Sequence, residues 1–283
     1  MKVEFIVLKK QSNLFTVQDE NGKIQTVPAR KNLKKDGIFV GDRVLLDEDG
    51  AIVKIMPRKN LLIRPPVANI DKMFIVIAPV PKPDLYTVDK LLIFCKLKQI
   101  QPTLCINKRD LDENVCKEIE KVYGKIVKTL IFSTLDESVQ KLKTQISGVC
   151  VLAGQSAVGK SSIINALKKK SVTKVDTFSK KIERGKQTTR VVELYEFGKN
   201  KFLADTAGFS KLDESLLNLE KEEIKSYYDE FLPYAEKCKY SSCLHTSLKD
   251  CGVCNAVKYG KISEVRYKNY LKMLEIVKNL KKY

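Results

Sequence analysis

The sequence contains no hydrophobic run long enough to cross a bilayer, and residues 1–5 lack the apolar core of a signal peptide. We therefore expect a cytoplasmic protein with no membrane partner. Acidic residues are also scarce, because 34 Asp and Glu stand against 52 Lys and Arg, a net charge of +18. This excess favours a polyanionic partner such as nucleic acid, since neutralised phosphates release counterions. The alternative is a Lys-rich composition that serves only solubility.

Histidine is nearly absent, with His245 as the single example in 283 residues. Of eight cysteines, four lie near His245 at the C-terminal end, where a reducing cytosol favours metal binding over disulfides. The other four lie singly in apolar segments, where we expect buried, inert thiols. These four are Cys95, Cys105, Cys116 and Cys150.

The most specific motif is G-x-x-x-x-G-K-S at residues 154–161. An apolar run precedes it at 149–153, and an apolar pattern with helical spacing follows at 162–167. A phosphate-binding loop requires this setting of strand, loop and helix. An ordinary strand–turn–helix that matches the motif by accident is the alternative.

Each fixed position of the motif has a chemical reason. Gly154 and Gly159 allow the tight turn that directs backbone N–H groups at a β-phosphate. We expect Lys160 to contact the β- and γ-phosphates and the Ser161 hydroxyl to bind Mg²⁺. The predicted phosphate-binding residues are Gly154, Gln155, Ser156, Ala157, Val158, Gly159, Lys160, Ser161 and Ser162.

A second motif, N-K-x-D at residues 107–110, follows a predicted strand at 102–106. The Asp110 carboxylate can accept hydrogen bonds from guanine N1 and the exocyclic N2 amine, whereas adenine offers no donor there. We expect Asn107 to brace neighbouring loops and the Lys108 stem to cover the base. The motif predicts a preference for guanine nucleotides.

Two further residues follow a later predicted strand. Ser133 and Thr134 come after it at the position where a backbone amide could meet guanine O6. An ordinary helix cap is the alternative interpretation. We include both residues in the predicted guanine site.

The segments that respond to the γ-phosphate are predicted downstream. Asp205 and Gly208 belong to a D-x-x-G motif, in which the aspartate holds Mg²⁺ through water and the glycine amide senses the γ-phosphate. The polar segment 185–190 has the character of a switch whose threonine closes on Mg²⁺. Thr188 and Thr189 both remain candidates for that threonine.

The order of these motifs is unusual. In an ordinary small GTPase the base-reading motif follows D-x-x-G, whereas here it precedes the phosphate loop. Circular permutation would leave the site intact, because the site depends on geometry and not on sequence order. A P-loop kinase or ATPase is the alternative, and the N-K-x-D motif argues against it.

Residues 1–62 predict a small β-barrel. Five short strand-like segments alternate with turn signals such as those at 21–22 and 49–50. We favour an OB-fold, which commonly binds oligonucleotides, over an SH3-like barrel. Basic loop residues would suit RNA phosphates or simply form a solvated rim: Arg30, Lys31, Lys34, Lys35 and Arg43.

Prolines at 57, 65 and 66 mark a linker, after which the pattern changes. Residues 63–215 alternate apolar strands with helices, which predicts a parallel sheet covered on both faces. Residues 216–283 remain as a helical domain with the cysteine cluster. The predicted strands of the middle domain lie at 72–78, 102–106, 125–131, 148–153, 191–197 and 201–204.

The C-terminal cysteines form the pattern C-x4-C-x-H-x5-C. Cys238, Cys243, His245 and Cys251 would supply three thiolates and one imidazole, a closed tetrahedral Zn²⁺ site of structural type. Cys254 competes with Cys251 on spacing alone. A helix predicted from residue 263 has an apolar side and could show a basic face to RNA. Its basic residues are Arg266, Lys268, Lys272, Lys278, Lys281 and Lys282.

Taken together, N-K-R-D, G-Q-S-A-V-G-K-S, G-K-Q-T-T-R, D-T-A-G-F and C-x4-C-x-H-x5-C resemble one family. It is the ribosome small-subunit-dependent GTPase A family, also called RsgA or YjeQ, and the resemblance covers nearly the whole chain. It implies an OB-fold, a circularly permuted GTPase domain and a zinc domain. It also supports Cys251 over Cys254 as the last zinc ligand.

The resemblance further implies a function. We expect hydrolysis of GTP to GDP and phosphate, slow for the free protein and stimulated by the small ribosomal subunit during its late maturation. The implied cofactors are GTP or GDP, Mg²⁺ and one structural Zn²⁺, and the implied partners are the small subunit and its rRNA. A monomer is the simplest expectation. The alternative is an RNA-binding assembly protein whose nucleotide is structural.

The sequence departs from the family pattern in three places. Gln187 stands where the family often has a histidine implicated in hydrolysis, so any catalytic role must pass to a glutamine that can orient water but not take its proton. Thr134 replaces a more common alanine or serine. Phe209 stands where many GTPases carry a water-orienting glutamine, and an apolar residue packing under the switch is the simpler interpretation.

Overall fold

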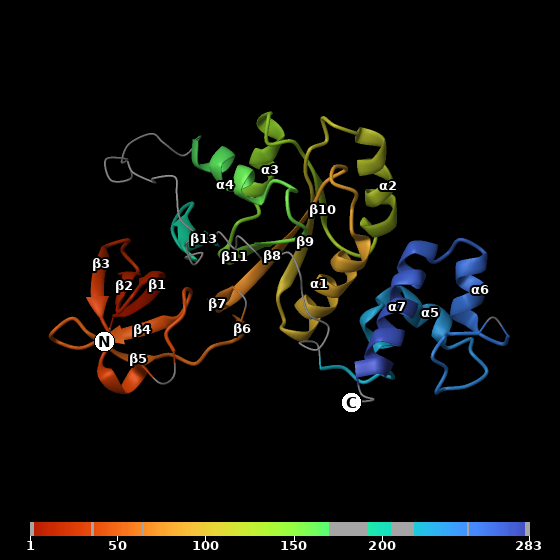
Figure 1. Ribbon diagram of the computed structural model, residues 1–283, viewed down its shortest axis with the longest axis horizontal. Coiled ribbons are helices and arrows are strands. Elements are labelled where there is room, and N and C mark those ends of the chain that lie inside the picture. The colour runs from red at the N-terminus through yellow and green to blue at the C-terminus, as the bar shows by residue number, and fades with distance from the viewer. Residues whose placement is uncertain are drawn as a thin grey trace.

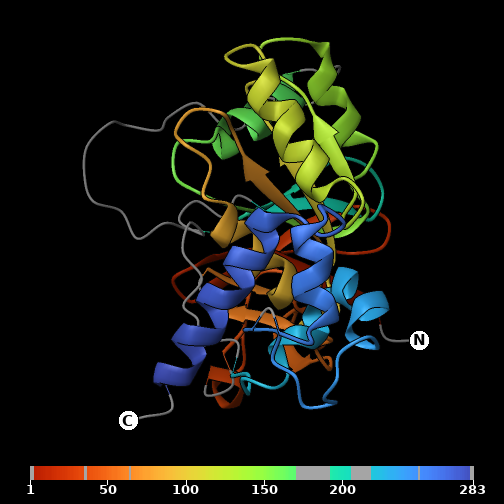
Figure 2. The ribbon, with the colours of Figure 1, turned by 90° about the vertical axis from the view of Figure 1, so that its right-hand side faces the viewer.

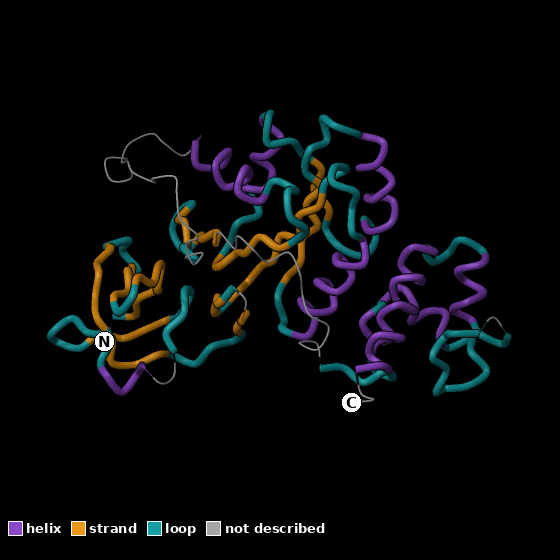
Figure 3. Tube along the Cα trace, in the orientation of Figure 1, coloured by secondary structure: helices purple, strands orange, loops and turns teal. Residues whose placement is uncertain are grey.

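The computed structural model of this chain describes residues 3–34, 37–63, 65–169, 192–204, 218–247 and 249–280. Three regions follow one another along the longest axis (Figure 1): a small barrel, a central sheet with helices, and a C-terminal helical region. Strands dominate the barrel, and helices and loops make up the described part of the C-terminal region (Figure 3). No helix in the described ranges is long and apolar enough to span a membrane.

The N-terminal region is a five-stranded antiparallel sheet with strand order β3-β2-β1-β4-β5. A parallel bridge between Ala29, directly after β3, and Ile52 of β5 joins the two edge strands. The resulting cycle, 1-2-3-5-4, is that of an OB-fold, so this prediction is confirmed and the SH3-like alternative is excluded. The strands are β1 (Glu4–Gln11), β2 (Leu14–Gln18), β3 (Ile24–Pro28), β4 (Arg43–Leu46) and β5 (Ile52–Ile55). Its core consists of Val7, Phe15, Val17, Val27, Ile38, Val44 and Ile52.

One of the basic loop residues of the barrel is neutralised within the chain. The Arg30 guanidinium donates to Asp47 at 2.6 Å and to Asp49 at 2.5 Å. This pairing favours the solvated-rim interpretation for Arg30. Lys35 lies outside the described residues.

The segment predicted as a linker forms a short hairpin of β6 (Leu61–Ile63) and β7 (Pro66–Ala68). Val67 pairs with Val40 of the barrel through an isolated parallel bridge. At Gly41 a Cβ atom would lie only 2.2 Å from the Ala68 carbonyl oxygen, so the two backbones are in close contact. The connection is therefore packed against the barrel.

The central sheet has the strand order β10-β9-β8-β11-β13-β12, and all neighbours are parallel except β12 and β13. The strand predicted at 125–131 is shorter than expected. The N–H groups of Ile126 and Val127 bond to the Tyr123 carbonyl and so belong to the end of the preceding helix. The strands are β8 (Ile70–Ile77), β9 (Gln101–Ile106), β10 (Thr129–Ile131), β11 (Gly148–Ala153), β12 (Leu194–Glu196) and β13 (Lys201–Ala204).

Helices cover both faces of this sheet, as predicted (Figure 2). On one face Ile75 packs in a cluster with Leu91, and on the other Val76 packs with Ile163, because successive strand residues point to opposite faces. The four cysteines predicted to be buried here are buried. The helices are α1 (Leu85–Leu97), α2 (Glu113–Tyr123), α3 (Gln140–Lys143) and α4 (Lys160–Lys169), with a short η2 (Glu137–Val139) before α3.

The C-terminal region packs on α1 through its last helix (Figure 2). Tyr270 and Met273 belong to the same apolar cluster as Leu91. Arg266 is buried and bonds to Asp89 of α1, so its predicted place on an RNA-facing basic surface is wrong. The elements are η4 (Ile224–Tyr227), η5 (Asp229–Phe231), α5 (Leu232–Ala235), α6 (Gly252–Lys258) and α7 (Glu264–Leu280).

Candidate functional site

The loop from β11 to α4 contains two glycines at positions that only glycine fits. Gly154 has a φ of +131°, and a Cβ atom there would lie 2.1 Å from the Val76 carbonyl oxygen. Gly159 has a φ of +95°, and its Cβ would lie 2.5 Å from Asn107 Nδ2. Backbone conformation and lack of space both exclude a side chain, which is the physical reason for the glycines of the motif.

The end of the loop has the polarity that an anion requires. Because α4 begins at Lys160, the N–H groups of its first turn have no intrahelical partners. Lys160 Nζ donates to the carbonyl oxygens of Gly154 and Gln155 at 2.7 and 2.8 Å, which holds the ammonium over the loop. Ser161 and Ser162 are exposed beside it. N–H groups, ammonium and hydroxyls together suit a phosphate and its cation.

Two side chains of the segment that follows β9 form hydrogen bonds to the loop between β11 and α4. Asn107 is fully buried, and its Nδ2 donates to the Val158 carbonyl at 2.9 Å, across 51 residues of sequence. Lys108 has a left-handed φ of +59°, and its Nζ donates to Ala157 O at 2.8 Å and to Val80 O at 2.9 Å. The structure thus brings the two predicted motifs together in one place.

The loop after β10 meets the same segment. Ser133 is buried, and its hydroxyl donates to the Asp110 carboxylate, while Thr134 follows it half-buried. Arg109 Nη2 bonds to Asp136 Oδ2 at 2.9 Å and forms a second link between the two loops. Asp110 itself is exposed, so its carboxylate can accept hydrogen bonds from a ligand.

The structure adds a role for Gln155 that the sequence did not reveal. Its Oε1 accepts from the Asp84 backbone N–H at 3.2 Å, and its Nε2 donates to Lys82 O at 3.2 Å. Asp84 caps α1, since its carboxylate accepts from the Thr87 N–H at 3.1 Å. An aspartate three residues before a threonine is a recognisable cap signal, whereas the contact with Gln155 depends on tertiary packing.

The predicted switch residues Gln187, Thr188, Thr189, Asp205 and Gly208 lie outside the described residues. The described chain includes the strands that lead to and from them. β13 ends at Ala204 and runs parallel to β11, so its carboxyl end lies at the same edge of the sheet as the phosphate loop.

In the C-terminal region, four residues form a compact cluster. The ligand atoms of Cys238, Cys243, His245 and Cys251 all lie within 4.8 Å of one another. His245 Nδ1 is 3.5 Å from the sulfur of Cys238 and 3.5 Å from the sulfur of Cys251. Cys254 is turned away, with its Sγ 3.2 Å from the Tyr267 hydroxyl and bonded to the His245 carbonyl oxygen.

Two of the four side chains in this cluster have pKa values shifted toward the form that binds a metal. Burial lowers the pKa of His245, which favours the neutral imidazole that a metal requires. Burial opposes ionisation of Cys238, but hydrogen bonds from the backbone N–H groups of Val253 and Gly252 and from the Cys251 and Cys243 side chains together bring the pKa of this thiol below its ordinary value. Burial raises the pKa of the Cys243 and Cys251 thiols, to about 11 for Cys251. A thiolate beside a neutral imidazole is the donor chemistry of Zn²⁺ sites.

Comparisons with known proteins point to one family, and the relatives match nearly the whole chain. The profile of the RsgA GTPase family matches residues 55–215. The small ribosomal subunit biogenesis GTPase RsgA of Caldanaerobacter subterraneus subsp. tengcongensis is 35% identical over 99% of this chain and 98% of its own length. The protein of the same name from Thermotoga maritima is 36% identical over 95% of this chain and 94% of its own.

Two solved structures share the fold. The crystal structure of YjeQ from Thermotoga maritima superposes with a TM-score of 0.78 at 32% identity, covering 98% of this chain and 99% of that one. YloQ, described as a circularly permuted GTPase, gives a TM-score of 0.78 at 29% identity, with coverage of 99% and 96%.

The sheet explains how permutation preserves the site. β11, which leads to the phosphate loop, lies between β8 and β13, and the loops after β9, β10 and β11 all follow the carboxyl ends of parallel strands. These loops meet at one edge whatever their order along the chain, and the predicted permutation is confirmed. The chain therefore belongs to the RsgA GTPase family and is a GTP hydrolase.

Proposed function

We propose that GTP binds where the base-reading segment meets the phosphate loop. The observation that carries this proposal is the bond from Asn107 Nδ2 to Val158 O, at 2.9 Å, supported by the bond from Lys108 Nζ to Ala157 O, at 2.8 Å. A nucleotide must contact both segments at a fixed separation. These bonds hold the two segments at that separation, and such preorganisation lowers the entropic cost of binding.

In this proposal the base is read by hydrogen bonds. The Asp110 carboxylate accepts from guanine N1 and N2, and the Ser133 hydroxyl orients that carboxylate. A backbone amide of the Ser133 and Thr134 segment meets guanine O6, and the Lys108 stem covers the base. Adenine lacks the two donors and would leave Asp110 unpaired, so we expect the site to exclude ATP.

The phosphates are held by the loop and by Lys160. The first-turn N–H groups of α4 and the Lys160 ammonium neutralise charge on the β- and γ-phosphates. Bound Mg²⁺ would withdraw further charge from these phosphates, with Ser161 as its protein ligand and Asp205 holding it through water. Gly208 completes the γ-phosphate contact. The remaining proposed nucleotide contacts are Gly154, Gln155, Ser156, Ala157, Val158, Gly159 and Ser162.

For hydrolysis we infer that this chain supplies some of the required groups and that its partner completes their positioning. Thr188 or Thr189 would bind Mg²⁺ when it is present, and Gln187 can orient the attacking water but cannot take its proton. Turnover by the free protein is therefore slow, because positioning of water and charge is incomplete. A partner that completes the positioning of water and charge accelerates the reaction.

We further propose one structural zinc ion bound by Cys238, Cys243, His245 and Cys251. Three thiolates and one imidazole complete a tetrahedral coordination sphere, which leaves no position for a catalytic water. The cluster lies where α6 begins, beside the aromatic residues of α7. Zinc in this position would stabilise the packing of the loops that precede α6.

The partner we propose is the small ribosomal subunit with its rRNA, during late maturation in the cytoplasm. The relatives carry that subunit in their names, and the net charge of +18 suits a polyanion. We infer three domains, at 1–62, 63–215 and 216–283, in a monomer. The barrel and the zinc domain would contact rRNA on either side of the GTPase domain.

Steady-state GTP hydrolysis tests the proposal. Purified protein is assayed alone and with purified small ribosomal subunits, with Lys160→Ala as the inactive variant and Lys121→Ala, an exposed lysine of α2, as its matched control. We expect slow turnover alone, strong stimulation by the subunit, and no turnover for Lys160→Ala. Tight GTP binding without stimulation would favour an RNA-binding assembly protein whose nucleotide is structural.

A further inference from the structure

Two tyrosines of α7 form hydrogen bonds to the loop that supplies the imidazole of the cysteine cluster. The Tyr270 hydroxyl donates to the Leu244 carbonyl oxygen at 2.6 Å, and the Tyr267 hydroxyl donates to the His245 carbonyl oxygen at 2.7 Å. Residues 243–245 belong to no helix or strand, so no helical or ladder bonds hold their carbonyl groups. The two hydroxyls therefore bond to carbonyl groups that secondary structure leaves free.

These two bonds fix the backbone on both sides of His245. The Leu244 carbonyl belongs to the planar peptide group before the His245 Cα atom, and the His245 carbonyl belongs to the peptide group after it. When both groups are held, the φ and ψ angles of His245 are set. Its φ is +53°, a left-handed conformation that a residue other than glycine keeps only where its surroundings hold it.

The conformation of His245 determines how it meets the three cysteines. Its Nδ1 atom lies 3.5 Å from the sulfur of Cys238 and 3.5 Å from the sulfur of Cys251. Its backbone N–H donates to the sulfur of Cys243 at 3.4 Å. A change in the backbone at this one residue would therefore disturb its contacts with all three sulfurs.

The imidazole lacks the support that a metal-binding histidine usually has. Such a histidine normally donates its other ring N–H to a carboxylate or a carbonyl, and that bond fixes the orientation of the ring. His245 Nε2 is buried and has no hydrogen-bond partner in the described part of the chain. Phe231 packs against the ring at a centroid distance of 6.0 Å and an interplanar angle of 89°. The ring is thus oriented through its backbone and through apolar packing.

The helix that carries both tyrosines is itself held in place. Arg266 of α7 forms the buried ion pair with Asp89 of α1 and bonds to Glu230 at 2.8 Å. Asn269 donates to the same Asp89 at 2.7 Å, and Tyr270 is fully buried. Hydroxyl groups on a helix with these anchors can hold a loop in one geometry, which is what a metal site needs.

We propose that Tyr267 and Tyr270 are positioning residues of the zinc site, which hold His245 in the left-handed conformation that directs Nδ1 at the metal. The inference rests on the proposed zinc ion and names the groups outside its coordination sphere that raise its affinity. Without the two hydroxyls the loop has more conformations available, and ordering it on metal binding costs more free energy.

Two conservative variants test the proposal in the full-length protein. Tyr267→Phe and Tyr270→Phe each remove one hydroxyl and keep the aromatic ring in the cluster. Zinc affinity is measured by competition with a chromogenic chelator at fixed pH. We expect each variant to bind zinc about tenfold more weakly than the native chain, and the double variant to bind it more weakly still.

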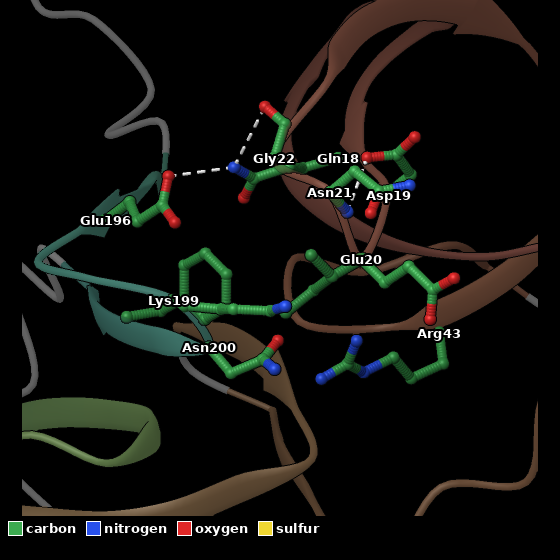
Figure 4. A pocket seen from close by; sticks show the side chains of 11 residues that line it. Gln18, Asp19, Glu20, Asn21, Gly22, Arg43, Glu196, Lys199 and Asn200 are labelled. Carbon is green, nitrogen blue, oxygen red and sulfur yellow. Dashed lines mark hydrogen bonds between the residues drawn. The ribbon is translucent and has the colours of Figure 1, made fainter.

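Two controls separate positioning from a general loss of stability. Tyr228→Phe changes the same aromatic cluster, since the rings of Tyr228 and Tyr270 are 5.3 Å apart, but the Tyr228 hydroxyl is buried with no hydrogen-bond partner among the described residues. Gln18→Ala breaks the bond from Gln18 Nε2 to Glu196 Oε2, at 2.8 Å, which joins the barrel to β12 (Figure 4). We expect both variants to keep zinc affinity within about twofold of the native value.

The single histidine of the chain gives a direct spectroscopic readout. Labelling with ¹⁵N-histidine yields the nuclear magnetic resonance signals of one imidazole, that of His245. In the native protein with zinc we expect one fixed tautomer, with the proton on Nε2 and the metal on Nδ1. In the double variant we expect these signals to broaden or to average, because the ring loses its fixed orientation. Tyr228→Phe should keep the native pattern.

Several results would overturn the proposal. Native zinc affinity in both Tyr267→Phe and Tyr270→Phe would exclude a positioning role and leave the zinc site itself intact. Equal weakening in Tyr228→Phe or Gln18→Ala would show that any loss of stability has the same effect. Metal bound to Nε2 in the native protein would contradict the orientation of His245. A native chain that binds no zinc would remove the proposed metal site and this inference together.

Discussion

Arg266 of α7 and Asp89 of α1 form a buried ion pair that joins the C-terminal helices to the central sheet. Both side chains are at most 3% exposed. Asp89 also accepts from the Tyr123 hydroxyl at 2.9 Å and from Asn269 at 2.7 Å, and Arg266 bonds to Glu230 at 2.8 Å. Burial raises the pKa of Asp89, and these partners oppose that effect. The pair therefore fixes how the two regions meet.

Breaking this pair should be strongly destabilising. Arg266→Met leaves the Asp89 carboxylate buried without its cation, and we expect the free energy of unfolding to fall by about 3–5 kcal/mol. Lys268→Met, two residues along the same helix, removes only an exposed pair with Glu264 and should have a far smaller effect. Urea unfolding followed by circular dichroism compares the two, and equal losses would contradict the role given to Arg266.

A methyl group at Gly159 should abolish nucleotide binding. Its Cβ would lie 2.5 Å from Asn107 Nδ2 and would push this side chain off the Val158 carbonyl, in addition to straining a φ of +95°. Gly50→Ala is the matched control, because Gly50 has a φ of +79° but nothing within 4 Å of the added carbon. We expect Gly50→Ala to lose only about 1–2 kcal/mol of stability and to bind fluorescent GDP normally. Normal GDP binding by Gly159→Ala would exclude the proposed arrangement.

Asp110→Asn should change the choice of base. The amide can no longer accept two hydrogen bonds from guanine, so we expect GTP affinity to fall about tenfold or more, while xanthosine triphosphate gains because its carbonyl can accept from the new amide. Asp112→Asn is the control, since this residue caps α2 and asparagine caps equally well. Competition between the two nucleotides measures the shift. An unaltered ratio in Asp110→Asn would remove Asp110 from the base site.

The two neighbouring cysteines should differ in their effect on zinc. Cys251→Ser removes a thiolate that lies 3.5 Å from His245 Nδ1, and we expect bound zinc to fall from about one atom per chain to well below that value. Cys254→Ser changes only a thiol beside Tyr267 and should keep the metal. Elemental analysis after gel filtration reports the content, and the opposite pattern would assign the ligand to Cys254.

Features that depend on neighbouring residues in the sequence were predictable. The phosphate loop needs a strand, two glycines and a helix within twenty consecutive residues, so its position and its backbone follow from the local pattern. The strand at 201–204 was predicted with its observed bounds, because its apolar run is bounded by turn residues. The motif order also indicated permutation, which the sheet order and the comparison with YloQ confirm.

Long-range packing decided the rest. Spacing favoured Cys251 but left Cys254 as a competing ligand, and the fold directs one sulfur to His245 and the other to Tyr267. The basic pattern of the last helix predicted that Arg266 lies on the surface. Its acidic partner Asp89 lies 177 residues earlier in the sequence, and a local sequence pattern carries no information over that separation. The sequence by itself therefore determined the family, the fold class and the candidate motifs, since these depend on short-range chemistry. Only the tertiary structure decided which polar groups are buried together, because those pairs form when separate segments pack.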